Sequence, residues 1–174
     1  MHTLHGVTLR ALAGGRLAEV CSTVLLSVGS PDESAEPDPP FSGIVADVFP
    51  GSGPLAGIHA GLRAMKTPRL LVMPCDMPFV SADTVHRLAA PSDSEAVVAV
   101  HNGLPIGVLA CYQASVLDKL ESCLRAGGEA LRVMEFVRSL TMWTPLEIGE
   151  VEASNVNRPD DLPAVPPNDL RGTL

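Results

Sequence analysis

The sequence has few aromatic side chains and little positive charge, and both shortages narrow the range of functions. Aromatic residues make up 3% of the 174 residues, so aliphatic side chains and alanine must fill the core, and a surface for stacking nucleic-acid bases is not expected. The 12 lysines and arginines are outnumbered by 20 acidic residues, and the net charge of -8 repels nucleic acid and anionic membranes. We therefore expect no nucleic-acid or membrane partner. A phosphate ligand would need a divalent cation, a helix N-terminus or a local basic group.

Closely spaced cysteines and targeting segments are also lacking. No zinc-knuckle or redox-dithiol spacing occurs among the four cysteines, so we expect reduced, buried thiols at Cys21, Cys75, Cys111 and Cys123. The 5 histidines form no HxxxH or similar ligand pair, which favours structural roles for them. No basic stretch precedes a long uncharged apolar run near the N-terminus, so neither a signal peptide nor a membrane span is predicted. By this reasoning we expect a cytoplasmic protein.

Short apolar runs alternate with helical periodicity along the first half of the chain. The predicted elements are strands at 23–28, 43–48 and 69–74 and helices at 9–21, at 55–65 and from the serine cap Ser81 onward. A segment at 30–41, rich in proline and acidic residues, predicts a surface loop. This alternation predicts an α/β fold of Rossmann-like type, in which a mostly parallel sheet carries helices on both faces.

The second half of the chain departs from this alternation. Its predicted elements are strands at 95–100, 106–112 and 142–148 and helices at 114–125, 130–140 and 159–162. Asn102 and Gly103, between the first two of these strands, are a typical hairpin signal. No linker between domains is visible. We therefore expect a single domain over residues 1–163 and a flexible tail over residues 164–174.

The strongest candidate for chemistry is Asp76, which follows the clearest buried strand in the string PCDMPF. In open α/β sheets, ligands bind beyond the carboxyl ends of the strands, so a carboxylate in this position points into the crevice and can hold a metal ion. The alternative is structural, because an aspartate between two prolines, here Pro74 and Pro78, is common as a turn cap.

A second candidate is the glycine-rich segment GSGPLAG at 51–57, between a predicted strand and a predicted helix. Glycines let the backbone approach a ligand, and the first amides of the helix that opens at Leu55 suit a phosphate or a carbonyl-rich base. The segment matches neither the P-loop nor the dinucleotide fingerprint. A structural turn, with close helix packing through Gly57 and Gly61, is therefore the alternative.

The third candidate is the pair Asn155 and Asn157 in the run NVN. Side chains alternate along an extended segment, so both amides lie on the same side. They can hold a ligand together, or they can cap the helix predicted from Pro159.

Four segments together resemble the molybdenum cofactor guanylyltransferases: GPLAGIHAGL at 53–62, PCDMPFV at 74–80, LPIGVLACY at 104–112 and NVNRPDDL at 155–162. Their order and spacing agree with that family over residues 4–162, and the combination is more specific than any one segment. The resemblance implies a nucleotidyltransferase-like domain of the nucleotide-diphospho-sugar transferase type. It also implies a reaction in which GMP from GTP is joined to the phosphate of molybdopterin that carries molybdenum, with magnesium (Mg2+) required and pyrophosphate released.

The same resemblance assigns roles to residues of this sequence. Asp76 is implied to be the catalytic residue, which holds magnesium and contacts the nucleotide. Asp47 matches the family aspartate that contacts the guanosine moiety, and Gly53, Pro54 and Leu55 belong to the same nucleotide site.

Asn155 and Asn157 are implied to line the substrate site near the phosphates or the pterin. The attacking group in this reaction is a phosphate monoester that is already anionic, so no general base is needed. Catalysis then consists of in-line positioning and charge neutralisation by metal.

One segment of the family is lacking. Family members begin with a strand followed by LAGGxSxRMGxDK, a loop that cradles the GTP triphosphate, whereas residues 4–21 resemble the helix that comes after that loop. The first strand of the sheet is then missing, which would expose the middle of the sheet. The basic side chains nearest to the motifs are Arg63, Lys66 and Arg158, too few to balance a triphosphate.

This lack leaves alternatives to the guanylyltransferase open. The chain could be a non-catalytic family member that binds molybdopterin or a partner enzyme of cofactor assembly, or a sibling that uses CTP for the same pterin. Pairing through the exposed sheet edge would make a homodimer.

Overall fold

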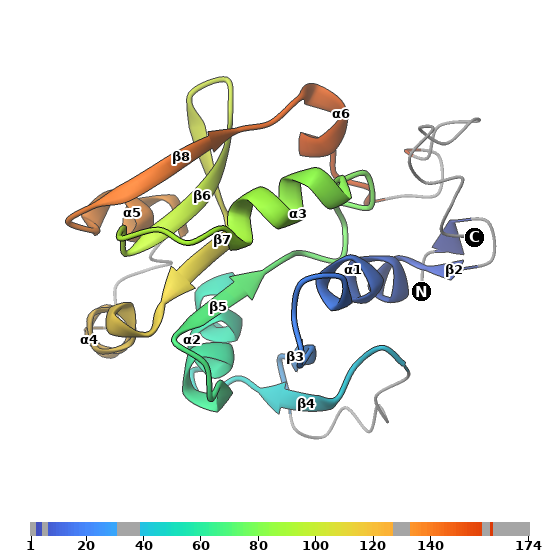
Figure 1. Ribbon diagram of the computed structural model, residues 1–174. Coiled ribbons are helices and arrows are strands. Elements are labelled where there is room, and N and C mark those ends of the chain that lie inside the picture. The colour runs from blue at the N-terminus through green and yellow to red at the C-terminus, as the bar shows by residue number, and fades with distance from the viewer. Residues whose placement is uncertain (1–2, 5–6, 31–38, 127–132, 158–160, 162–174) are drawn as a thin grey trace.

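The computed structural model describes residues 3–4, 7–30, 39–126, 133–157 and 161 (Figure 1). The predicted tail and most of the predicted acidic loop lie outside these residues, and so does most of the helix predicted at 159–162.

Strands and helices alternate through much of the described chain, as the sequence predicts. In chain order they are β1 (Thr3–Leu4), β2 (Val7–Thr8), α1 (Leu9–Ala18), β3 (Leu25–Val28), β4 (Gly43–Ala46), α2 (Pro54–Ala64), β5 (Arg69–Val72), α3 (Ala82–Ala89), β6 (Ala96–His101), β7 (Leu104–Gln113), the 3-10 helix η1 (Ala114–Val116), α4 (Leu117–Arg125), α5 (Val133–Ser139), β8 (Trp143–Glu147) and α6 (Glu150–Ala153). Three of these were not predicted, namely β1, β2 and α6, because elements of 2 to 4 residues are too short for a periodic pattern.

The strands of the described residues form three sheets. β1 and β2 are an antiparallel pair, and β3 and β4 are a parallel pair. The third sheet has four strands in the order β5-β7-β6-β8. Within it, β5 and β6 both run antiparallel to β7, and β8 runs parallel to β6.

The Rossmann-like α/β class is confirmed, but the sheets are mixed, and the expectation of a mostly parallel sheet needs this correction. The reason lies in the predicted hairpin, where Asn102 and Gly103 have φ angles of 52° and 75°. Two successive positive φ angles reverse the chain in a tight turn, which pairs β6 with β7. β7 then inserts beside β5, so it is antiparallel to both of its neighbours.

β3 and β5 are edge strands of separate sheets, although one helix packs against both. A Cβ atom at Gly57 of α2 would lie 2.9 Å from Oγ of Ser27 in β3, and one at Gly61 would lie 3.0 Å from Leu70 in β5. No strand pairing joins β3 to β5 among the described residues. The expectation that a missing strand exposes the middle of the sheet is consistent with these two edges.

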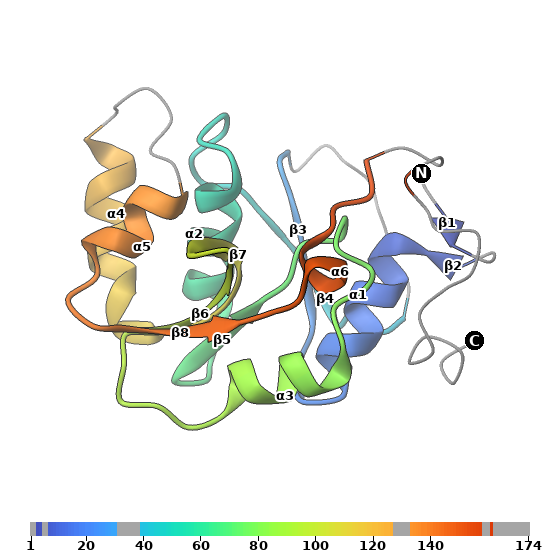
Figure 2. The same cartoon turned by 90° about the horizontal axis from the view of Figure 1, so that it is seen from above.

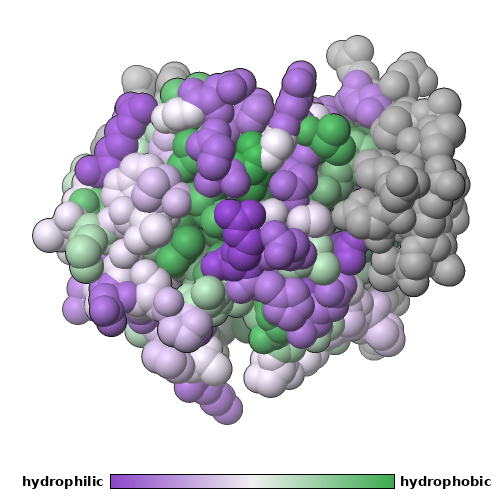
Figure 3. Space-filling model, turned by 45° about the horizontal axis from the view of Figure 1, so that its top comes forward, coloured by the Kyte–Doolittle hydropathy of each residue, from purple (hydrophilic) through white to green (hydrophobic). Residues whose placement is uncertain are grey.

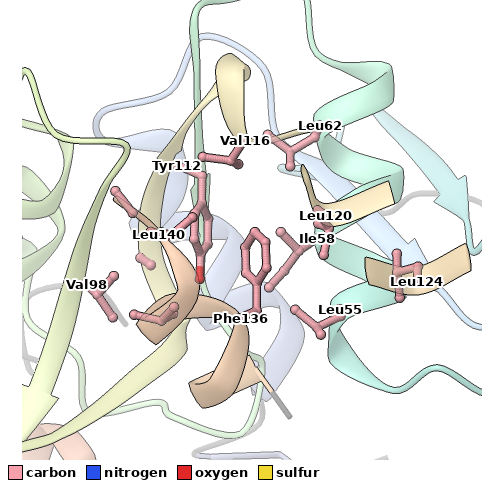
Figure 4. Packing of buried hydrophobic residues seen from close by; sticks show 13 residues of the cluster. Leu55, Ile58, Leu62, Val98, Tyr112, Val116, Leu120, Leu124, Phe136 and Leu140 are labelled. Carbon is pink, nitrogen blue, oxygen red and sulfur yellow. The ribbon is translucent and has the colours of Figure 1, made fainter. Parts of the chain in front are cut away.

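Two apolar clusters cover the two faces of the four-stranded sheet. Seen from above, α2, α4 and α5 lie on one side of the strands and α3 lies on the other (Figure 2). In the first cluster, Tyr112 and Phe136 lie among side chains of α2 such as Leu55 and Ile58 (Figure 4). The hydroxyl of Tyr112 donates to the carbonyl of Gly107 at 2.7 Å, and burial raises the pKa of Tyr112. This face of the sheet is therefore closely packed.

The surface is mostly hydrophilic on the face shown in Figure 3, where hydrophobic groups are small and scattered. Among the described residues, the large apolar side chains that are exposed belong to separate segments of the chain, and they are Val48, Leu104, Met142 and Val151. Within the described ranges, no helix combines the length and the apolar character needed to cross a bilayer.

Candidate functional site

The Asp76 turn, residues 73–80, follows β5 directly. Its apolar residues Met77, Phe79 and Val80 are 1%, 5% and 0% exposed and anchor the turn in the core. Asp76 itself is partly exposed. None of the described residues donates a hydrogen bond to its carboxylate.

Cys75 precedes Asp76 and is exposed, and Cys21 and Cys123 are only partly buried, so the expectation of buried thiols is correct for Cys111 alone, although all four are free. Partial burial of the sulfur raises the pKa of Cys75, the Asp76 carboxylate raises it further, and the Arg10 guanidinium lowers it. Arg10 of α1 therefore brings a positive charge close to the Asp76 turn. The sequence analysis missed Arg10, because it is distant in sequence and belongs to no motif.

Residues 154–157, which we call the asparagine strap, lie against the Asp76 turn. The backbone N–H of Val156 donates to the carbonyl of Asp76 at 2.7 Å, and the Val156 side chain is buried in the same cluster as Phe79. Asn155 and Asn157 are both exposed. The alternation expected for an extended segment is thus observed, with the valine inward and the two asparagines outward beside Asp76.

The glycine-rich segment forms the N-terminus of α2. Gly51 and Gly53 have φ angles of 82° and 63°, and Gly53 is the N-cap, with no side chain capping the helix. Pro54 is the first helical residue, and the first turn contains no acidic residue, so the helix presents the positive end of its dipole there. The side chain of Leu55 is fully buried, so only its backbone could take part in binding.

Asp47 follows β4 and lies beside the same helix. Its backbone N–H donates to the carbonyl of Val28 at 3.1 Å, across the β3–β4 pair. A Cβ at Gly57 would lie 3.9 Å from Oδ1 of Asp47 and 2.9 Å from Oγ of Ser27. The close helix packing expected at Gly57 is therefore present, and it brings Asp47 next to α2.

The structure thus forms two groups of the predicted site residues. Asp76 and the asparagine strap are in direct contact at the end of β5, while Asp47 lies with the N-terminal part of α2 at the end of β4. Both groups stand beyond the carboxyl ends of strands, where α/β folds bind ligands.

Of the basic side chains expected nearby, Lys66 lies past the other end of α2. Arg158 falls outside the described residues.

Arg63, the third of these basic side chains, belongs to a separate polar cluster. It pairs at 3.7 Å with Glu121 of α4, which also pairs with Arg125 and lies 3.4 Å from Nε2 of the buried His59. Hydrogen bonds from Arg125 and His59 lower the pKa of Glu121. The structural role expected for His59 is consistent with this cluster, which joins α2 to α4.

Comparison of the sequence with known proteins gives a family match and close relatives. The family of the MobA-like NTP transferase domain matches residues 1–141. A relative from Chloroflexus aggregans is 34% identical over 171 residues, which are 92% of this chain and 80% of that protein. The molybdenum cofactor guanylyltransferase of Burkholderia lata is 35% identical over 143 residues, which are 76% of this chain and 70% of that protein.

Solved structures share the fold. Molybdopterin-guanine dinucleotide biosynthesis protein A of Archaeoglobus fulgidus superposes with a TM-score of 0.72 at 22% identity, over 92% of this chain and 84% of that one. The 2-C-methyl-D-erythritol 4-phosphate cytidylyltransferase of Thermus thermophilus gives a TM-score of 0.67 at 22% identity, over 91% and 87%. The expected nucleotide-diphospho-sugar transferase type is therefore confirmed as a fold.

Proposed function

The chain belongs to the MobA-like NTP transferase family, and from that premise we propose that it transfers GMP from GTP to molybdopterin, giving the guanine dinucleotide form of the cofactor. The observation that carries the proposal is the Asp76 turn. Its carboxylate stands at a strand end, is partly exposed and receives no hydrogen bond from the described residues, while the asparagine strap lies directly beside it. A metal site and a substrate surface would thus be adjacent.

Nucleotidyltransferases of this kind use a divalent metal, and we propose magnesium held by Asp76. The donor chemistry fits, because magnesium prefers oxygen ligands and is usually bound by one or two carboxylates together with substrate phosphates and water. The described residues contain no cluster of three or more His, Cys, Asp or Glu side chains that would form an all-protein site. This agrees with a metal held jointly by Asp76 and the nucleotide. When bound, the metal would neutralise phosphate charge.

The guanosine triphosphate is proposed to lie along the N-terminal end of α2. Asp47 would contact the guanosine moiety, and Gly53, Pro54 and the backbone of Leu55 would line the nucleotide site. The N-terminus of α2 supports this assignment, because no side chain caps it and its positive dipole end attracts anionic or carbonyl groups. Arg10, near the Asp76 turn, adds a positive charge in a chain whose net charge is -8.

The chemistry needs little more than positioning. A phosphate oxygen of molybdopterin attacks the α-phosphorus of GTP, a new P–O bond forms, and the bond to the β-phosphate breaks with its electron pair leaving on pyrophosphate. The nucleophile is already anionic, so no residue of this chain has to remove a proton. Asn155 and Asn157 would hold the pterin or its phosphate in line.

The test is guanylyl transfer by the purified chain with GTP, magnesium and molybdopterin, followed as pyrophosphate release and dinucleotide formation. Replacement of Asp76 by Asn should lower kcat/KM by at least about a hundredfold, because the metal contributes several kcal/mol of charge stabilisation. Asp93→Asn is the matched control, because Asp93 is an exposed aspartate outside the Asp76 turn.

Three results would contradict the proposal. One is dinucleotide formation by Asp76→Asn at the unmodified rate. Another is transfer from CTP in preference to GTP, which would point to the cytidylyl sibling. The third is binding of GTP with magnesium but no transfer, which would favour the non-catalytic member.

A further inference from the structure

Glu152 of α6 receives an unusual number of hydrogen bonds on one oxygen. Its Oε1 accepts from the backbone N–H of Ser81 at 2.9 Å, from the Ser81 hydroxyl at 2.7 Å and from the Thr84 hydroxyl at 2.7 Å. Both donors belong to the start of α3, about seventy residues earlier in the chain. The carboxylate therefore joins two segments that are remote in sequence.

The donors are themselves part of a helix cap. The Ser81 hydroxyl accepts from the backbone N–H of Thr84 at 3.2 Å, which is the cap that the sequence predicts, and the same hydroxyl donates to Glu152. Burial alone would raise the pKa of Glu152, but the hydrogen bonds from Ser81 and Thr84 outweigh it and hold the pKa below its ordinary value. Glu152 is thus held as an anion at the positive end of α3.

This anchor stands at a particular place relative to the candidate site. α3 begins directly after the Asp76 turn, and the asparagine strap begins directly after α6. The chain is thus fixed just before the strap, through Glu152 to Ser81, and again inside the strap, through the N–H of Val156 to the carbonyl of Asp76. The two attachments flank Asn155, and the second directly precedes Asn157, so the strap has little freedom to move away from Asp76.

We propose that Glu152 is a positioning residue, which holds Asn155 and Asn157 at the distance from Asp76 that the molybdopterin substrate requires. The claim rests on the proposed function for the identity of the substrate. Glu152 itself would touch neither substrate nor metal, since its carboxylate is taken up by Ser81 and Thr84. Its effect would therefore appear in the affinity for the pterin and not in that for GTP.

The experiment compares Glu152→Ala, Glu152→Gln and the control Glu150→Gln in the full chain. Glu150 lies on the same short helix and is exposed. For Glu152→Ala we expect KM for molybdopterin to rise about tenfold or more, with KM for GTP unchanged, because small misplacements of positioning groups are costly. Glu152→Gln keeps one acceptor oxygen and should recover part of the loss, whereas Glu150→Gln should behave as the unmodified chain.

A second readout does not depend on activity. Hydrogen exchange at the amide of Val156 should become at least about tenfold faster in Glu152→Ala, while exchange in β6 stays the same, because only the strap loses an attachment. A role in stability alone would instead lower the melting temperature with no split between the two KM values.

The outcomes separate the two claims. A folded Glu152→Ala chain with unchanged exchange at Val156 and unchanged KM for molybdopterin overturns the positioning role, and if that variant does not fold, Glu152→Gln decides by the same measurements. If the unmodified chain transfers no GMP, the proposed function fails, and exchange at Val156 alone then supports or overturns the anchoring of the strap.

Discussion

β6 and β3 are both short aliphatic strands, but they differ in strand pairing and in burial. β6 pairs with β7 on one side and β8 on the other, and every residue from Ala96 to Val100 is buried. β3 pairs with β4 alone, its leucines are only partly buried, and Ser27 is exposed. The candidate site lies at the ends of β4 and β5, on the incompletely paired side. Strand pairing and burial are thus greater at β6 than around the candidate site, a contrast that is common for ligand-binding segments.

The largest expected difference between the halves concerns leucine packing. Leu120→Ala should lower the free energy of unfolding by about 3 to 4 kcal/mol, because Leu120 of α4 is fully buried in the first apolar cluster and its loss leaves a cavity. Leu26→Ala in β3 should cost only about 1 to 2 kcal/mol, because that side chain is partly exposed. Urea unfolding followed by circular dichroism measures both losses of stability. Equal losses would contradict the difference in packing between the two leucines.

Glycine packing gives the next largest effect. A Cβ at Gly107 of β7 would lie 2.4 Å from Val133 and 2.9 Å from Val137, so Gly107→Ala should destabilise the protein by about 2 kcal/mol through overcrowding. Gly29, just after β3, has no atom within 4 Å of such a Cβ. Gly29→Ala should therefore change stability by less than about 0.5 kcal/mol. Thermal melting of the two variants checks the contrast, and a tolerated alanine at Gly107 would argue against close packing of α5 on β7.

The protection of backbone amides from hydrogen exchange should also differ between β3 and β6, but this difference is smaller than the two effects on stability. Alternate residues of a strand direct their N–H and C=O groups to opposite sides, so half of the β3 amides point away from β4. In the free protein these amides should exchange at least about tenfold faster than those of β6, because the described residues provide them with no strand partner. Mass spectrometry or NMR can measure the exchange. Protection of β3 equal to that of β6 would show that its free edge is covered in solution.

The smallest effect is a dependence of stability on pH. The folded state lowers the pKa of Glu152 from its ordinary value of 4.5, so Glu152 contributes stability above that pH and loses it as pH falls through the lowered pKa. Below pH 4.5, the unmodified chain should thus lose more stability than Glu152→Gln, which cannot titrate. Unfolding midpoints at pH 6, 5, 4 and 3 provide the measurement. Parallel acid profiles would contradict the assigned hydrogen bonds.

Local signals predicted much of this structure from the sequence. The Ser81 cap, the Asn102-Gly103 turn and the strand leading to Asp76 are all specified by neighbouring residues, and each is present. The insertion of β7 beside β5 was not predicted, because no local signal indicates it.

The same limit applies to the candidate site. Asp76 and the two asparagines could be singled out from their motifs. Arg10 and Glu152 could not, because the residues that they influence, Cys75 and Ser81, are remote from them in the sequence and no periodic pattern or motif marks them. Their importance follows from tertiary contacts alone.

The most direct test of the account is hydrogen exchange of the whole chain with and without GTP and magnesium. We predict added protection after β4, at the start of α2 and in the Asp76 turn, with β6 and β8 unchanged. Omission of magnesium, or Asp76→Asn, should remove the added protection in the Asp76 turn. No protection in any of these segments, or protection confined to β8 and α3, would contradict the claim that the incompletely paired half holds the nucleotide.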